Sequence, residues 1–491
     1  MQKTTIFFNS LMFLLFSVSF SYAQQDYQKW LEDQQKQFQE FKDARDKAFV
    51  EFLKKEWQAF QLFQGMVPDK TPKPAEIPKT ALNDNIKEIT PVPANVITEV
   101  RIPKAPLQKT AEFFDWFKPT AKPKQEELKF SFFDREIQLV YESKIKNIMP
   151  KKPIDGEQIS NFWAEMSSTD YENLLDQTKQ LQQKMKLNDW GYCLLLQRIG
   201  SNIYQQRENE TNIFVWYLLT KSGYDSKVGY DKNQVYLLLT ARNIIYGVPF
   251  FETNQKKYYL ITFEQEKINA NQLYTYEGNY PRADELISLN VDNVPVINQF
   301  VEARELKFDY FGEAHKIKLK IKKDVINFFE NYPQTDYEIY FNASLSEEAN
   351  YSLLTQFKPI IEGKTEVEAA NILLRFVQLA FEYQTDEAQF NREKIFFAEE
   401  TLFYPFSDCE DRSILFAYLV RELLGLKVIG LDYPGHIATA VKFSTPVTGK
   451  TVTHNGEKYL ICDPTYINAN VGQSMPKFQQ ETPAIISLDV K

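Results

Sequence analysis

Residues 407–425 hold the pattern that most strongly predicts the fold of the C-terminal part of the chain. The stretch begins Ser407-Asp408-Cys409-Glu410-Asp411-Arg412 and continues with apolar residues at helical spacing as far as Gly425. This spacing predicts a helix that starts near Cys409 and ends at Gly425. A cysteine in the first turn lies at the positive end of the helix dipole, which favours its thiolate. Because the neighbouring carboxylates oppose that effect, an activated thiol here needs a further cation.

Two strands that follow this helix supply partners for the cysteine. His436-Ile437-Ala438-Thr439-Ala440-Val441 alternates as a strand, and the pair Asn455-Gly456 is a strong hairpin signal. The return strand runs from Lys458 to Thr465 and carries Asp463 near its end. A nucleophilic thiol needs a base to take its proton and a third group to orient that base. We therefore expect Cys409, His436 and Asp463 to meet at one end of a sheet.

The remaining cysteines and histidines have simpler interpretations. Cys193 lies within a helical apolar stripe and is expected to be a buried core thiol. Cys462 points to the strand face opposite Asp463 and is expected to pack there, although a disulfide to Cys409 is an alternative that would remove the nucleophile. His454 is expected at a solvated hairpin tip and His315 at the surface.

The motifs Asp408-Cys409-Glu410-Asp411, Gly435-His436-Ile437-Ala438 and Asp463-Pro464-Thr465 resemble the Cys, His and Asp motifs of the transglutaminase-like superfamily, a papain-related fold. The resemblance covers roughly residues 355–470. It implies acyl transfer through a thioester on a protein or peptide substrate, with Cys409 as nucleophile, His436 as base and acid, and Asp463 as orienter. Ala438 departs from the aromatic residue common at its position, which implies a different acceptor groove.

The chain also shows an internal repeat. Glu127-Leu128-Lys129-Phe130-Ser131-Phe132-Phe133 recurs as Glu305-Leu306-Lys307-Phe308-Asp309-Tyr310-Phe311, at an offset of 178 residues. Further matches follow in the same order, so we expect two copies of one α+β unit at residues 126–300 and 301–491. The predicted fold is thus two tandem transglutaminase-like units.

The first copy is expected to be inactive. The positions that match the cysteine, histidine and aspartate of the second copy hold Arg207, Gln234 or Val235, and Phe263. No histidine precedes His315, so residues 126–300 contain no thiol–imidazole pair. We expect this copy to be retained for packing or for holding substrate.

Three segments precede the repeat. Residues 1–23 combine a positive start, a short apolar run and Ser21-Tyr22-Ala23, which predicts a signal peptide cleaved after Ala23 and a periplasmic or secreted protein without a later transmembrane segment. Residues 24–64 contain no proline and one long amphipathic pattern, which predicts a helix that docks on the body or self-associates. Residues 65–125 contain ten prolines and are expected to form an extended linker.

Composition limits the function further. The 491 residues include 39 Phe and 27 Tyr, which requires a large buried core. With 57 basic and 66 acidic residues and no dense basic run, nucleic-acid binding is disfavoured. Three cysteines and three histidines disfavour a Cys/His zinc site, and no cofactor or metal is predicted.

Two functions remain. The first is an exported cysteine-dependent enzyme that hydrolyses protein or peptide amides rather than cross-linking them, since no acceptor site is evident. The second is a non-catalytic binding or scaffolding protein built from the same domains. The intact set of Cys409, His436 and Asp463 in only one copy favours the enzyme.

Overall fold

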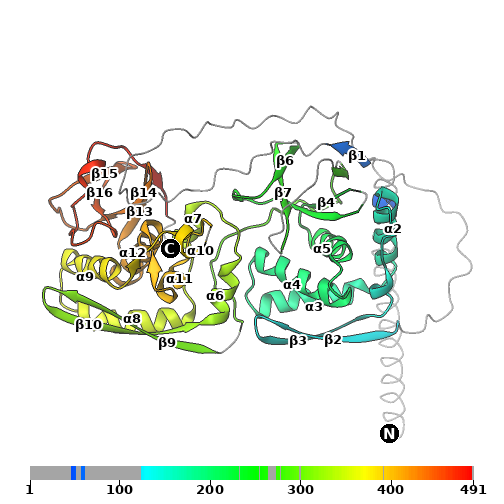
Figure 1. Ribbon diagram of the computed structural model, residues 1–491, viewed down its shortest axis with the longest axis horizontal. Helices are drawn as coiled ribbons and strands as arrows, with labels where there is room; N and C mark the ends of the chain where they lie inside the picture. Colours follow the sequence, from blue (N-terminus) through cyan, green and yellow to red (C-terminus); the bar gives the residue numbers. More distant parts are fainter. Residues whose placement is uncertain are drawn as a thin grey trace, which may run out of the picture.

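A computed structural model describes residues 46–50, 57–60 and 123–488, with gaps at 232, 254, 264–272, 277, 298–299 and 391. The predicted signal peptide (1–23) and nearly all of the Pro-rich linker (65–125) lie outside the described residues. The structure is mixed α+β, as the sequence predicted. It consists of an N-terminal unit (residues 123–297) and a C-terminal unit (residues 300–488), which lie side by side (Figure 1).

The N-terminal unit passes from a hairpin through helices to an antiparallel sheet. The hairpin is β2 (Gln125–Phe132) and β3 (Arg135–Glu142). The helices are η1 (Ile145–Asn147), α2 (Gly156–Ser167), α3 (Tyr171–Lys184), α4 (Asp189–Ile203) and α5 (Glu208–Ser222). The sheet contains β4 (Ser226–Tyr230), β5 (Val235–Leu239), β6 (Phe250–Thr253), β7 (Lys256–Ile261) and β8 (Leu273–Tyr276).

The C-terminal unit follows the same plan with additional short elements. Its hairpin is β9 (Val301–Tyr310) and β10 (Glu313–Lys322). The helices are α6 (Lys323–Glu330), α7 (Tyr337–Asn342), α8 (Glu347–Ile361), α9 (Glu366–Leu379), α10 (Asp386–Phe390), α11 (Ala398–Phe403) and α12 (Cys409–Leu424). The strands are β11 (Glu382–Tyr383), β12 (Phe406–Ser407), β13 (Lys427–Tyr433), β14 (His436–Lys442), β15 (Thr451–His454), β16 (Glu457–Cys462) and β17 (Ala484–Ile486), with η2 (Pro476–Phe478) between the last two.

The main sheets of the two units share one strand order. The N-terminal sheet runs β8-β4-β5-β7-β6, with β1 (Trp57–Phe60) added at the edge beside β8, and the C-terminal sheet runs β17-β13-β14-β16-β15. Helix α5 packs on β4 and β5, as α12 packs on β13 and β14. Both helices end at a glycine with positive φ, Gly223 at 108° and Gly425 at 65°, a conformation that glycine adopts without steric cost. The two units therefore have the same topology from hairpin to sheet.

In each unit the helices lie between the hairpin and the sheet. The hairpins β2–β3 and β9–β10 lie along the same edge of the molecule, below the helices in Figure 1. Side chains on the inner face of the first hairpin, such as Phe130 and Phe132, are buried. The units are joined at their boundary, where Asn188 donates to the Tyr332 hydroxyl at 2.7 Å and Phe133 packs edge-on against Phe328.

The long helix predicted for residues 24–64 falls largely outside the described residues, and where it can be compared it is partly wrong. Residues 46–50 are helical and dock on the N-terminal unit, where Phe49 packs against Trp163 with ring centroids 4.7 Å apart. Residues Trp57–Phe60, however, form strand β1, which pairs antiparallel with β8. The unpaired backbone groups at this edge of the sheet favour an added strand over a continued helix.

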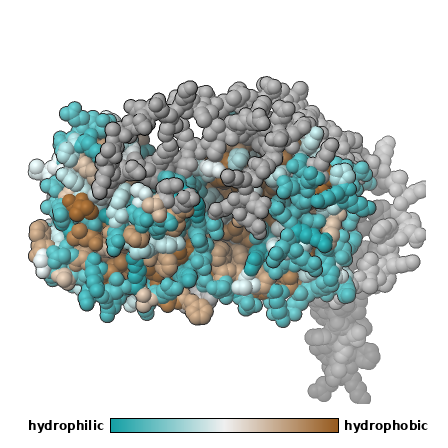
Figure 2. All heavy atoms as spheres, in the orientation of Figure 1, coloured by the Kyte–Doolittle hydropathy of each residue, from teal (hydrophilic) through white to brown (hydrophobic). Residues whose placement is uncertain are grey.

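The described surface on the face seen in Figure 2 is mainly hydrophilic, with smaller hydrophobic patches. Exposed apolar residues in such scattered positions are normal for a folded protein. Among the residues that the structure describes, none of the helices combines the length and the apolar character that crossing a bilayer requires.

Candidate active site

Cys409 is the first residue of α12, which confirms the helix start predicted from the sequence. Asp408 caps this helix, and its backbone N–H donates to Asp411 Oδ2 at 3.2 Å. The Cys409 side chain is fully buried. Its thiol donates a hydrogen bond to Glu410 Oε2 at 3.2 Å. Cys409 is thus held at the helix N-terminus beside Glu410.

His436 and Asp463 meet at the end of two neighbouring strands. His436 is the first residue of β14, and Asp463 directly follows β16. The antiparallel pairing of these strands brings the two side chains together, with His436 Nε2 3.0 Å from Asp463 Oδ2. Both residues are only 2% exposed. Oδ1, the other carboxylate oxygen of Asp463, accepts hydrogen bonds from the Thr465 N–H at 3.1 Å and from the Thr465 hydroxyl at 3.0 Å.

The cysteine lies next to the histidine strand. The backbone N–H of Ile437, the residue after His436, hydrogen-bonds to the sulfur of Cys409. One turn into α12, the Ser413 hydroxyl donates to the Ile437 carbonyl at 3.0 Å. These two contacts fix the start of α12 against the start of β14. The structure therefore brings the three predicted residues to one end of the C-terminal sheet.

The electrostatics of Cys409 differ from the sequence expectation of a stabilised thiolate. Burial, reinforced by the charge of Asp408, raises the pKa of Cys409 to about 12, although the Ile437 amide acts in the opposite direction. The sequence expected the strand that begins at His436 to supply the further cation. Lys477 also lies nearby, since its charge interacts with Cys409 and Asp463. Burial lowers the pKa of Lys477. The positive charge of Lys477 does not outweigh the desolvation that raises the pKa of Cys409. The resting site holds a thiol.

An aromatic ring covers the histidine. Phe478 stacks on the His436 ring with centroids 4.8 Å apart and planes 4° from parallel. The ring of Tyr433 also stacks on Phe478, with centroids 4.9 Å apart. Phe478 and Lys477 belong to η2, a single turn after the last strand of the site. Sequence reasoning missed both because one isolated turn has no periodicity that links it to the site.

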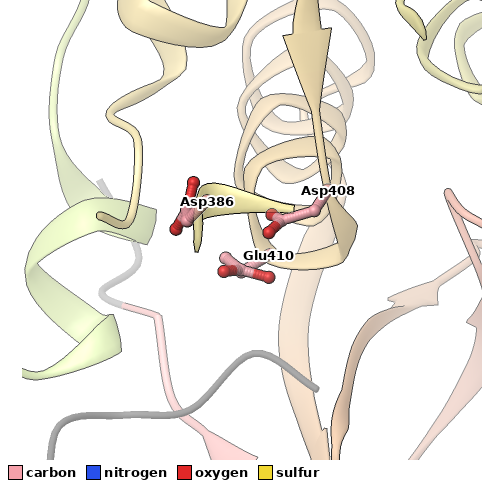
Figure 3. A group of neighbouring side chains, drawn as sticks. All are labelled: Asp386, Asp408 and Glu410. Atoms are coloured by element: carbon pink, nitrogen blue, oxygen red, sulfur yellow. The ribbon is translucent and has the colours of Figure 1, made fainter. Parts of the chain in front are cut away.

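A group of three carboxylates adjoins the cysteine. Oxygen atoms of Asp386, Asp408 and Glu410 lie within 4.8 Å of one another, and all three residues are buried. Figure 3 shows the carboxylates pointing toward one another from α10 and the start of α12. Asp386 was also missed, because nothing in its local sequence connects it to residues 408–410. Such an oxygen-rich group is able to hold a cation.

The other thiols and imidazoles have the environments that the sequence predicted. Cys193 and Cys462 are buried and free, so no disulfide joins Cys462 to Cys409. His454 ends β15 and lies 3.0 Å from the side-chain amide of Asn455. His315 is partly exposed on β10, where it stacks on Phe308 at a centroid distance of 5.0 Å.

In the N-terminal unit, the repeat predicted Arg207 at the position of Cys409 and Gln234 or Val235 at the position of His436. Counting back from the glycines that end the two helices, Gly223 and Gly425, matches Arg207 with Cys409, although Arg207 is the N-cap of α5 and Cys409 is the first residue of α12. Val235 begins β5 as His436 begins β14, and each pairs with a tyrosine at the end of the preceding strand. Neither side chain can serve as a nucleophile or a base.

The third position requires a correction. The sequence offset matched Asp463 with Phe263, but the strand register matches it with Ile261. The match to Phe263 uses an offset of 200 residues, whereas the strand pairing gives an offset of 202. Ile261 is as unable as Phe263 to orient a base.

Comparison with family models, with curated protein sequences and with solved structures finds no match for this chain. The function of this chain is therefore inferred from its sequence motifs and from the geometry of the site.

Proposed function

We propose that the C-terminal unit is a transglutaminase-like acyl-transfer domain of an exported protein, and that it hydrolyses protein or peptide amides through a thioester on Cys409. One observation carries the proposal. A buried imidazole, His436, is oriented by Asp463 at 3.0 Å and lies directly beside the residue whose amide contacts the Cys409 sulfur. A base, its orienting group and a thiol in this arrangement are the components that nucleophilic catalysis by cysteine requires.

The reaction would proceed in two balanced steps. The Cys409 proton passes to His436 while the sulfur attacks the amide carbon, and the leaving amine takes that proton as the C–N bond breaks. Water then loses a proton to His436 and attacks the thioester, which releases the acid and returns the proton to the sulfur. Because Nε2 of His436 faces Asp463, Nδ1 is the nitrogen left to exchange the proton. Asp463 stabilises the imidazolium in both steps.

The resting arrangement requires a rearrangement before this chemistry. The Cys409 thiol donates to Glu410 and has to turn toward His436 for proton transfer. The ring of Phe478 also has to move for a substrate to reach the imidazole. Substrate binding would supply the energy for both movements. The N-terminal unit, without the corresponding side chains, would act in packing or in holding substrate.

One observation favours the alternative of a non-catalytic binding protein. The site is closed, and the pKa of Cys409 is raised to about 12 by its burial. A pair of domains that had lost catalysis in one copy and kept only a structural thiol in the other would show the same features. The two functions differ in whether Cys409 is required for any turnover.

Incubation with casein and a labelled amine separates them. We expect the wild type to release peptides or ammonia, and Cys409→Ala to release neither. Cys462→Ala is the matched control, because it removes a second buried free thiol of the same unit. Incorporation of the amine would assign cross-linking instead of hydrolysis. Equal results from the wild type and Cys409→Ala would refute the enzyme and favour the binding protein.

A further inference from the structure

The hairpin of the C-terminal unit ends in an exposed phenylalanine. Phe311 lies in the turn between β9 and β10 and is 82% exposed. Its φ of 51° lies in the left-handed region, which a bulky side chain rarely adopts. Gly312 continues the turn with a φ of 83°. The turn therefore presents a large apolar ring to the surroundings of the protein.

The same turn in the N-terminal unit uses its phenylalanine as a contact. Phe133 is the equivalent of Phe311 in the repeat, and its φ of 46° is nearly the same. Phe133 packs edge-on against Phe328 of the C-terminal unit, with ring centroids 5.8 Å apart. Phe311 contacts the ring of its chain neighbour Tyr310, at 4.7 Å, and is left mostly uncovered by the residues that the structure describes. The repeat thus shows this turn acting as a docking element, with its partner present in one unit only.

The outer face of the same hairpin carries a row of lysines. Lys316, Lys318 and Lys320 are exposed and alternate with buried apolar residues along β10. Side chains two positions apart on a strand lie on the same face. Lys307 of β9 is the cross-strand neighbour of Lys316 and adds a fourth ammonium group. Glu305 lies 3.4 Å from Lys307 and 3.9 Å from Lys316, but exposed ion pairs of this kind are weak and leave the lysines accessible.

The N-terminal hairpin provides an internal comparison. At the offset of 178 residues, the positions of the three β10 lysines hold Gln138, Val140 and Glu142. Residues 303–320 contain five basic and three acidic residues, whereas the equivalent residues 125–142 contain two basic and five acidic residues. The N-terminal hairpin pairs in the same register without the lysines, so the fold does not require them. The lysine row and the exposed ring therefore indicate a role that belongs to the C-terminal hairpin alone.

We propose that the β9–β10 hairpin docks this protein on the surface of an anionic lipid bilayer. The Phe311 ring would enter the head-group boundary, and the lysine row would contact the anionic head groups. An apolar group combined with a basic patch gives membrane binding that neither provides alone. Each lysine near an anionic bilayer adds to the attraction. The proposal does not depend on Cys409 being catalytic.

The charge of the rest of the molecule restricts the contact to this end. The chain has 57 basic and 66 acidic residues, so its overall charge opposes binding to an anionic surface. The two hairpins lie along the same edge of the molecule (Figure 1), and they differ in the sign of their charge. The molecule would therefore tilt, with the Phe311 turn toward the bilayer and the N-terminal hairpin away from it.

Co-sedimentation of the purified protein with lipid vesicles tests the proposal. The probes are vesicles of phosphatidylcholine alone and vesicles of phosphatidylcholine and phosphatidylglycerol in equal amounts. The test variants are Phe311→Ser and the triple variant Lys316→Gln/Lys318→Gln/Lys320→Gln. The matched control is Tyr351→Ser, which removes an aromatic side chain of α8 that is 73% exposed. Circular dichroism checks that each variant is folded.

We expect the wild type and the control to bind the anionic vesicles at least ~10-fold more tightly than the neutral ones. Added salt should weaken this binding, because it screens the lysines. The triple variant should bind both kinds of vesicle equally. Phe311→Ser should weaken binding to anionic vesicles about 10-fold and should keep the salt dependence, because it removes the apolar contact alone.

Four outcomes would overturn the proposal. The wild type could bind neither kind of vesicle, or both kinds equally. The triple variant could bind as the wild type does, or the control could lose as much binding as Phe311→Ser. Binding that requires the lysines but is unchanged in Phe311→Ser would assign this face to an anionic partner other than a bilayer.

Discussion

The protonated state of Cys409 gives a quantitative prediction for its reactivity. In the double variant Cys193→Ala/Cys462→Ala, Cys409 is the single thiol, so every alkylation event reports on it. Burial raises its pKa from the ordinary 9.0 to about 12. Because only the thiolate reacts, the reactive fraction at pH 8 falls from about one in ten to about one in 10⁴. We therefore expect iodoacetamide to label the folded variant at least ~10³-fold more slowly than the urea-unfolded variant.

The assay is the rate of mass gain by intact mass spectrometry between pH 6 and pH 10. The folded rate should rise tenfold for each pH unit over this entire range, whereas the unfolded rate should level off near pH 9. The unfolded protein serves as the control for the intrinsic reactivity of the reagent. A folded rate within tenfold of the unfolded one, or a plateau below pH 8, would refute the assignment of a buried resting thiol.

Three further predictions concern Asp463, Phe478 and Glu399. Asp463→Ala leaves His436 without its 3.0 Å partner and should lower turnover by at least ~10²-fold with an unchanged circular dichroism spectrum; a smaller loss would contradict the orienting role. Phe478→Ala should lower the free energy of unfolding in urea by about 3 kcal/mol and should increase the rate at which Cys409 is alkylated. Unchanged values in both assays would contradict the packing of the Phe478 ring over the site. Burial raises the pKa of Glu399 from 4.5 to about 7, so the folded state binds its proton more tightly than the unfolded state does. The bound proton therefore adds about 3 kcal/mol to the free energy of unfolding below pH 4.5, and this contribution is lost as the pH rises to 7. Denaturant unfolding of Glu399→Gln between pH 4.5 and pH 7 should not show this loss.

The parts of the fold that the sequence predicted are those with local signals. The start of α12 at Cys409 and its end at Gly425 follow from apolar spacing and from a glycine in the left-handed conformation. The turn at Asn455 and Gly456 has positive φ at both residues, as its dipeptide predicts. The positions of His436 and Asp463 on adjacent strands follow from the strand pattern alone.

The features that were missed depend on contacts between distant segments. Phe478 and Asp386 reach the site from η2 and from the short helix α10, whose local sequences do not identify them. The sequence predicts a thiolate at Cys409 from the helix dipole. Burial, which no sequence pattern measures, has the larger effect on the pKa of Cys409. Strand β1 replaced the end of the predicted helix because pairing with β8 is a tertiary interaction.

A burst assay with p-nitrophenyl acetate tests the central claim most directly, because it reports formation of an acyl-enzyme without knowledge of the natural substrate. We expect a burst of one nitrophenolate per chain that develops slowly, because the resting thiol is buried, with the acetyl group on Cys409. The burst should be lost in Cys409→Ala, slowed in His436→Ala and unchanged in Cys462→Ala. A burst of equal size in Cys409→Ala, or acetylation confined to other residues, would contradict the account.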